Sequence, residues 1–155
     1  MSEYKVIGQN LPRVDAQDKV TGRAKYTLDI KLARMLYGRI LGSMLPHAKI
    51  LKINTRRAER LPGVKAIITA ADMPDARYGF ILKDRTILAR DKVRYIGEPI
   101  AAVAAIDEET ADEALGLIQI EYQELPAIFH PEEAMAAGAP LIHEELNNYA
   151  AIMEI

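Results

Sequence analysis

Residues 91–126, with the sequence DKVRYIGEPIAAVAAIDEETADEALGLIQIEYQELP, constrain the fold more than any other stretch. Ile100 to Ala105 form a continuous apolar run that is too short for a helix, which predicts a strand covered on both faces. Asp107 can then cap a helix whose apolar residues share one face: Ala111, Ala114, Leu115 and Ile118. From Leu117 the period changes to two, which predicts a second strand ending at Leu125-Pro126.

These elements form a β-α-β unit over residues 99–122. Because a helical crossover of this length most economically joins parallel neighbours, we expect the two strands to pair in parallel, with a right-handed connection, inside a mixed sheet. The expected fold class is therefore α+β, with short helices.

The rest of the chain contains further short elements. Residues 1–22 are expected to be an extended lead-in with solvated turn carboxylates at Asp15 and Asp18, and residues 74–85 to be an irregular loop. The expected strands are 35–44, bent at Gly38 and Gly42, and 48–53, 64–69 and 86–88. The expected helical segments are a short helix ending at Arg60, one turn at 70–73, and a helix at 131–138 that begins with proline.

Composition excludes several function classes. The chain has 155 residues, no cysteine and a net charge of −2 from scattered charges, so disulfides, thiolate chemistry and an iron–sulfur cluster held by this chain are excluded, and no nucleic-acid footprint is visible. No apolar run approaches the roughly 20 residues that span a bilayer, and the N-terminus lacks signal-peptide character. We expect no membrane partner and a cytoplasmic location.

No reactive constellation is visible. The three histidines, His47, His130 and His143, lie far apart and are expected at the surface, and no serine lies in a GxSxG elbow. Gly97-Glu98-Pro99 is the sharpest local feature, and we interpret it as a structural turn because GxGxxG and GxxxxGK[ST] are both absent. We therefore predict no catalytic, cofactor-binding or metal-binding residue.

Several segments together resemble a known domain: VTGRAKY, PHAKI, LPGV and GEPIAAVAA. In order along the chain, they are similar to the N-terminal a/b hammerhead domain of the large, molybdenum-binding subunit of the xanthine dehydrogenase and aldehyde oxidase family. DKVRYIGEP and Tyr78-Gly79 resemble bacterial members such as 4-hydroxybenzoyl-CoA reductase or carbon monoxide dehydrogenase-like subunits.

The resemblance implies molybdopterin in the large subunit, [2Fe–2S] clusters in a small subunit and FAD in a third component. The family's catalytic glutamate and pterin-binding segments match nothing here, so no cofactor is assigned to this chain. We expect a hammerhead domain over residues 1–146 and, at 147–155, the start of a linker to missing C-terminal molybdopterin-binding domains.

The expected function is structural: a domain that helps to assemble an oxidoreductase. Its contacts with the iron–sulfur subunit, the FAD subunit or other domains are expected near Arg77, Tyr78, Gly97, Glu98 and Pro99. The alternatives are a stand-alone binding or assembly module without activity and a small free-standing α/β enzyme. A homodimer formed through exposed apolar surface is also open.

Overall fold

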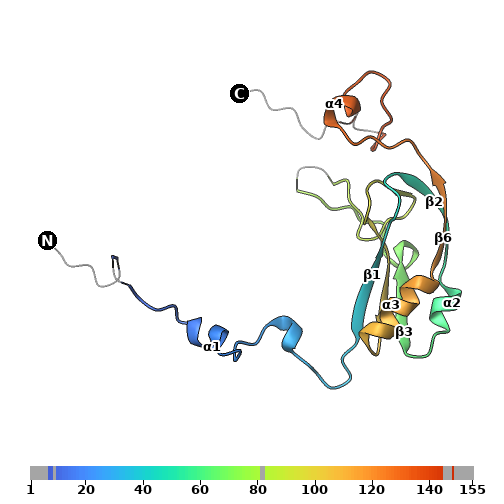
Figure 1. Ribbon diagram of the computed structural model, residues 1–155. Helices are drawn as coiled ribbons and strands as arrows, with labels where there is room; N and C mark the ends of the chain where they lie inside the picture. The colour runs from blue at the N-terminus through green and yellow to red at the C-terminus, as the bar shows by residue number, and fades with distance from the viewer. Residues whose placement is uncertain (1–6, 9, 81–82, 145–147, 149–155) are drawn as a thin grey trace. The chain divides into compact units, whose positions relative to one another are not determined.

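The computed structural model describes residues 7–8, 10–80, 83–144 and 148, and the chain divides into two units, Met1–Met35 and Leu36–Ile155 (Figure 1). The expected linker at 147–155 lies outside the described residues, apart from Asn148. The boundary expected between residues 146 and 147 therefore stays a prediction.

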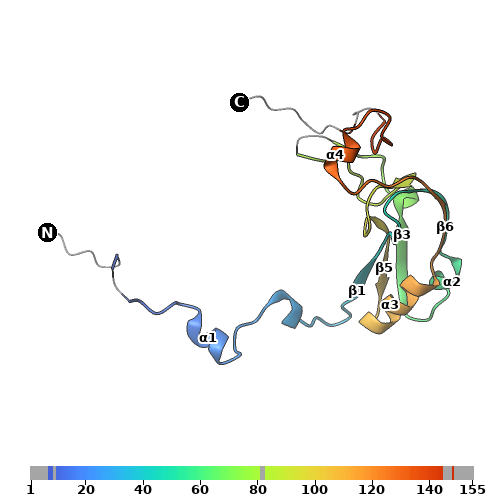
Figure 2. The ribbon, with the colours of Figure 1, turned by 45° about the horizontal axis from the view of Figure 1, so that its top comes forward.

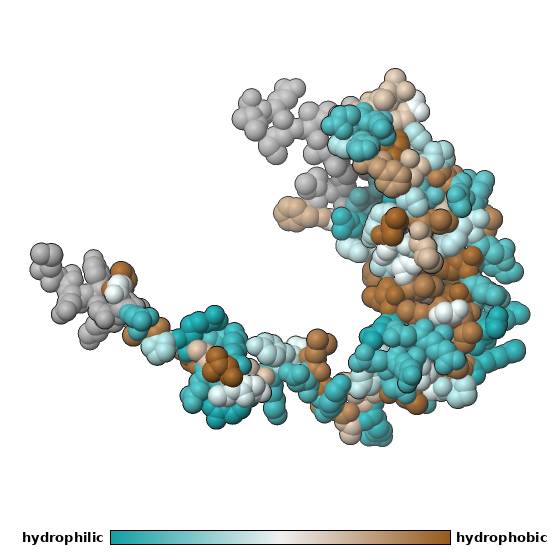
Figure 3. Space-filling model, viewed as in Figure 1, coloured by the Kyte–Doolittle hydropathy of each residue, from teal (hydrophilic) through white to brown (hydrophobic). Residues whose placement is uncertain are grey.

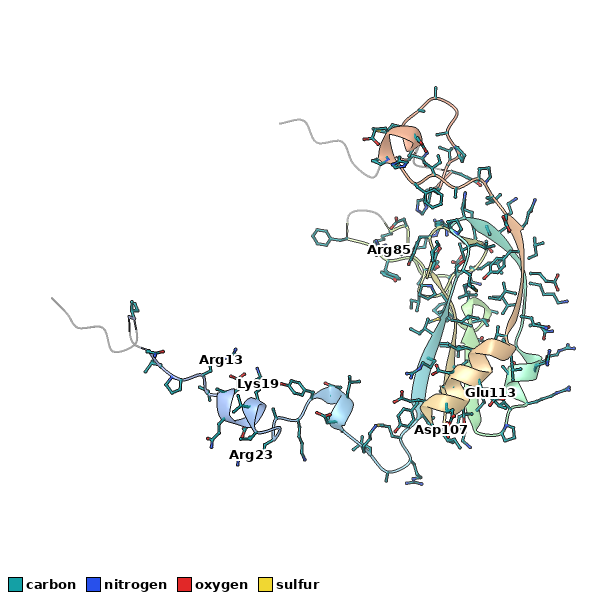
Figure 4. The ribbon with its side chains drawn as sticks, in the orientation of Figure 1. Arg13, Lys19, Arg23, Arg85, Asp107 and Glu113 are labelled. Carbon is teal, nitrogen blue, oxygen red and sulfur yellow. The ribbon has the colours of Figure 1, made fainter. Side chains whose placement is uncertain are left out.

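The first unit contains helix α1 (Ala16–Val20) and a 3-10 helix at Thr27–Asp29, neither of which has a buried residue. Where the sequence predicted an extended lead-in, α1 forms one helical turn and closes at Gly22, which has a φ of +71°. The Asp15 carboxylate lies 2.5 Å from the Lys19 ammonium and 3.2 Å from the Arg13 guanidinium (Figure 4). These exposed ion pairs agree with the solvated carboxylate that the sequence predicts at Asp15.

The second unit contains two three-stranded sheets. The first has the order β1-β5-β3, formed by Tyr37–Gly42, Pro99–Ala105 and Val64–Thr69. The second has the order β4-β2-β6, formed by Lys92–Val93, Ala48–Asn54 and Gln119–Glu124. The α+β fold class is confirmed, as are the strands expected near 35–44, 48–53 and 64–69.

The predicted parallel pairing is wrong. Helix α3 (Glu108–Leu117) does connect β5 to β6, but these strands belong to different sheets, and all pairings between named strands of the described chain are antiparallel. The physical reason is that both edges of β5 are already occupied, by β1 and β3, so the chain leaving α3 has no free edge there. Strand β6 pairs with β2 instead.

Helix α3 covers one face of the first sheet (Figure 2). Its cap is as predicted, since the Asp107 carboxylate accepts a hydrogen bond of 2.7 Å from the Thr110 amide. The apolar face is also confirmed: Ala111 and Ala114 are fully buried and Ile118 is 8% exposed. The Arg39 guanidinium on β1 donates to Glu108 at 2.6 Å and to Asp112 at 2.8 Å, which joins the sheet to the outer side of the helix.

The core has two parts. One, under α3 and helix α2 (Arg56–Glu59), contains Ala101 and Val103 of β5; the other contains Ala48, Ala89, Val93 and Ile100. Ile53 and Ile120 contact both parts, so the second sheet connects them. Strand β5 therefore supplies buried side chains to both parts of the core.

Two smaller expectations differ. Residues 86–88 are not a strand; nearby, an isolated bridge pairs Tyr78 with Arg85. Helix α4 is shorter than expected, at Pro131–Ala134, although it begins with proline as predicted. The helical turn expected at 70–73 is confirmed as a 3-10 helix at Ala70–Asp72.

Candidate functional site

Backbone hydrogen bonds join the turn before β5 to two other segments of the chain. The Gly97 amide donates to the Ser43 carbonyl at 2.7 Å, and the Ser43 amide donates to the Glu98 carbonyl at 2.9 Å. The Ala89 amide donates to the Pro99 carbonyl at 2.7 Å. Gly97 has a φ of +87°, a conformation that glycine adopts without steric cost.

Gly42 explains why the turn lies so close to β1. The register of β1 against β5 shifts at Gly42, and a Cβ built there would lie 3.0 Å from both Cα and O of Gly97. The bend predicted from this glycine is confirmed. The backbone that approaches the Gly97 turn is thus the chain's own, in agreement with a structural turn.

Glu98 points into the protein. Its side chain is buried, and the Oε2 atom accepts a hydrogen bond of 2.5 Å from the Arg94 amide. Burial raises the pKa of Glu98, while the hydrogen bond from the Arg94 backbone, the Arg94 charge and the Tyr95 backbone oppose this rise. A perturbed carboxyl can indicate a catalytic group, but here its partners are those of a turn that it stabilises.

The loop over residues 74–85 is held at several points. The Tyr78 amide donates to the Arg85 carbonyl at 2.8 Å, and the Arg85 amide donates to the Tyr78 carbonyl at 3.1 Å. Arg85 is labelled in Figure 4. Arg90 donates to the Met73 carbonyl at 2.9 Å, and Asp84 lies 3.5 Å from the His143 ring. Arg77 is exposed and half of Tyr78 is exposed, so both lie at the surface of this loop.

The five residues expected at a partner contact therefore lie in two places, Arg77 and Tyr78 in the loop and the other three in the turn. Gly97 is exposed, whereas Pro99 is half-buried and Glu98 is buried. Their role in an interface stays a prediction.

His47 corrects another expectation. It is not a surface residue: it is 4% exposed, and its Nδ1 lies 2.7 Å from the Pro126 carbonyl oxygen. The ring is buried because β2 begins beside the end of β6, where the Leu125 amide also donates to the His47 carbonyl at 3.0 Å. His130 is exposed as predicted, and His143 is half-buried.

His47 also lines a hollow of about 280 Å³. The other lining residues are Pro46, residues 94–96, residues 127–129 and Ile142. Sequence reasoning missed this site because its walls come from distant parts of the chain.

Over the part of the chain that the structure describes, no group of three or more histidine, cysteine or carboxylate side chains could hold a metal ion. Among the described residues we also find no helix with the length and apolar character needed to cross a membrane.

Comparison with known proteins identifies the domain. The family model for the a/b hammerhead domain of aldehyde oxidase and xanthine dehydrogenase matches residues 21–126. A probable xanthine dehydrogenase subunit of Bacillus subtilis (strain 168) is 46% identical over 136 residues, covering 87% of this chain and 18% of that protein. The nicotinate dehydrogenase large molybdopterin subunit of Eubacterium barkeri is 40% identical over 146 residues, covering 94% of this chain and 34% of that protein.

Solved structures agree. The reconstituted CO dehydrogenase from Oligotropha carboxidovorans superposes with a TM-score of 0.81 at 35% identity, covering 86% of this chain and 17% of that one. The chain spans 18% and 34% of the two curated relatives named above. Since the family model covers most of the sequence and both sheets with α3, the chain belongs to the aldehyde oxidase and xanthine dehydrogenase family as its a/b hammerhead domain.

Proposed function

We propose that this chain is the N-terminal structural and assembly domain of the large subunit of a molybdenum hydroxylase, an oxidoreductase. The observation that carries the proposal is the hammerhead match over residues 21–126, together with relatives of which this chain spans only a fraction. We assign this domain a structural role and no step of the reaction.

The proposed partners are molybdopterin-binding domains of the same large subunit, an iron–sulfur subunit and an FAD subunit. Molybdopterin is part of the name of the Eubacterium barkeri relative, which supports the first of these. A cytoplasmic location belongs to the same proposal and is tested by cell fractionation.

Contact with these partners is proposed at the loop over residues 74–85 and at the turn of Gly97, Glu98 and Pro99. The exposed Arg77 and Tyr78 can act directly, whereas the buried Glu98 can act only by holding the turn in shape. Replacing Arg77 or Glu98 in a reconstituted complex should weaken assembly, and unchanged affinity for both variants contradicts this assignment.

The decisive experiment is to purify the protein from its native locus and to assay the material for molybdenum, iron and flavin. Molybdenum together with a longer polypeptide or further subunits supports the proposal. A colourless chain without partners instead supports a stand-alone module that has kept the fold without the enzyme. Turnover by the isolated chain would favour a free-standing enzyme.

A further inference from the structure

The Asn148 side chain binds three backbone groups near the C-terminal helix α4. Its Nδ2 donates to the Ala134 and Pro140 carbonyls, each at 3.0 Å, and its Oδ1 accepts from the Ile142 amide at 3.0 Å. These bonds use both donors and the acceptor of an amide side chain. Asn148 has a φ of +61°, a left-handed conformation that asparagine adopts more readily than most residues.

These three bonds join the segment of residues 140–143, here called the strap, to the end of α4. Ala134 is the last residue of α4, and the final carbonyls of a helix have no partner within the helix. Asn148 supplies a partner to the Ala134 carbonyl and, with the same side chain, holds Pro140 and Ile142 of the strap. The position of the strap therefore depends on Asn148.

The strap contacts the loop over residues 74–85 through His143. Nε2 of His143 lies 3.5 Å from Oδ2 of Asp84, and the two side chains are 15% and 28% exposed. Solvent and salt screen a partly buried contact less than one on the open surface. Asp84 precedes Arg85, whose amide and carbonyl are both hydrogen-bonded to Tyr78. A continuous series of contacts thus joins α4 to the bridge between Tyr78 and Arg85.

We propose that Asn148 is a positioning residue for this loop. It fixes the strap to α4, the strap holds His143 against Asp84, and this contact keeps the Tyr78–Arg85 bridge closed. The coupling works in both directions, because a coupling free energy is shared by the two sites that it joins. Opening of the bridge therefore loosens the strap as well. This inference concerns the fold of the domain itself and does not require the proposed function.

Hydrogen–deuterium exchange in the full-length protein, purified from its native locus, tests the coupling. The Tyr78 and Arg85 amides exchange only when the bridge between them opens, so their exchange reports on the loop directly. Asn148→Gly keeps access to the left-handed backbone and removes the side-chain amide. We expect exchange to become about tenfold faster over residues 134–143 and about two- to fivefold faster at the bridge, with no change in β5.

Asn54→Gly is the matched control, because Oδ1 of Asn54 also accepts a backbone hydrogen bond, from the Arg56 amide at 3.3 Å, outside the strap and the loop. It should leave exchange at the bridge unchanged. Asp84→Ala removes the last contact of the series and should speed exchange at the bridge by about two- to fivefold. When Asn148→Gly is added to Asp84→Ala, the bridge should exchange no faster, because both changes act through one contact.

Three results overturn the inference. In Asn148→Gly, faster exchange confined to residues 134–143 means that the loop does not depend on Asn148, and equally faster exchange in β5 means that Asn148 supports the whole fold instead of the strap. In the combined variant, effects that multiply at the bridge mean that the two residues act independently. If Asn148→Gly yields no folded protein, His143→Gln takes its place, and unchanged exchange at the bridge in both His143→Gln and Asp84→Ala overturns the inference.

Discussion

The two faces of the β1-β5-β3 sheet have similar residues, but the face toward α3 is buried, whereas the opposite face is buried at Ile100 and exposed farther along the strands. On the face toward α3, Val103 of β5 is 2% exposed. On the opposite face, Ile40 and Ile68 flank Ala102 in one row across three strands, and they are 62% and 41% exposed. Gly38, Ala104 and Ala66 form the next row.

This difference shows that an apolar strand predicts that both of its faces are covered by other residues, but it does not predict which segment covers each face. The residues of β5 read PIAAVAA and are apolar on both faces, and among the described residues α3 covers one of these faces. Figure 3 shows apolar surface gathered where β1 lies. Substitutions on the two faces should therefore have unequal effects.

The largest difference is expected between Val103→Ala and Ile40→Ala. Val103→Ala leaves a cavity under α3 and should cost about 2 kcal/mol of unfolding free energy, whereas Ile40→Ala should cost less than about 1 kcal/mol. Denaturant unfolding of both variants measures the comparison. Equal costs would mean that the Ile40 face is covered as well.

Two glycine substitutions in β1 sharpen the comparison, because this strand contains one glycine at a close backbone contact and one on the exposed face of the sheet. Gly42→Ala places a Cβ 3.0 Å from the Gly97 backbone and should cost about 1–3 kcal/mol. Gly38→Ala is the matched control on the open face, where the nearest atom is the Val103 carbonyl oxygen at 4.0 Å, and it should be neutral or slightly stabilising. Thermal melting of both variants checks this, and a harmless Gly42→Ala contradicts the close approach.

The free energy of unfolding should depend on pH through Asp107, which caps α3. The Thr110 hydroxyl and amide hold the pKa of Asp107 below its usual value. A lowered pKa stabilises the fold above the ordinary pKa of the group, and this stabilisation is lost as the pH falls through the lowered value. We expect a modest loss, smaller than that of Val103→Ala, in acid titrations of stability. In Asp107→Asn, which keeps a capping oxygen, this part of the acid response should vanish; its persistence would assign the response to other carboxylates.

A small effect on stability is expected for Ile40→Lys combined with Ile68→Lys. Both side chains are exposed, so the free energy of unfolding should change by less than about 1 kcal/mol. If the open face drives self-association of the isolated chain, the same variant should abolish it. Sedimentation velocity at several concentrations measures this, with Lys65→Glu as a surface control. Self-association that survives the double change places any homodimer contact elsewhere.

Local features of the sequence determined most of the elements. The spacing of Ala111, Ala114 and Ile118, the Asp107 cap and the alternation in β6 are each encoded within a few residues, and the structure has them where they were predicted. Gly42 likewise indicated the bulge in β1. These features depend on contacts over one helical turn or on one backbone conformation, which a sequence shows directly.

Tertiary structure alone decided three other properties. Strand β6 pairs with β2, because both edges of β5 are paired with β1 and β3. Glu98 lies buried in a turn whose backbone hydrogen-bonds to the distant Ser43, and His47 is buried against Pro126, which lies 79 residues away in the sequence. Each of these three properties depends on which distant segment of the chain packs beside the residue. The local spacing of apolar residues does not contain that information.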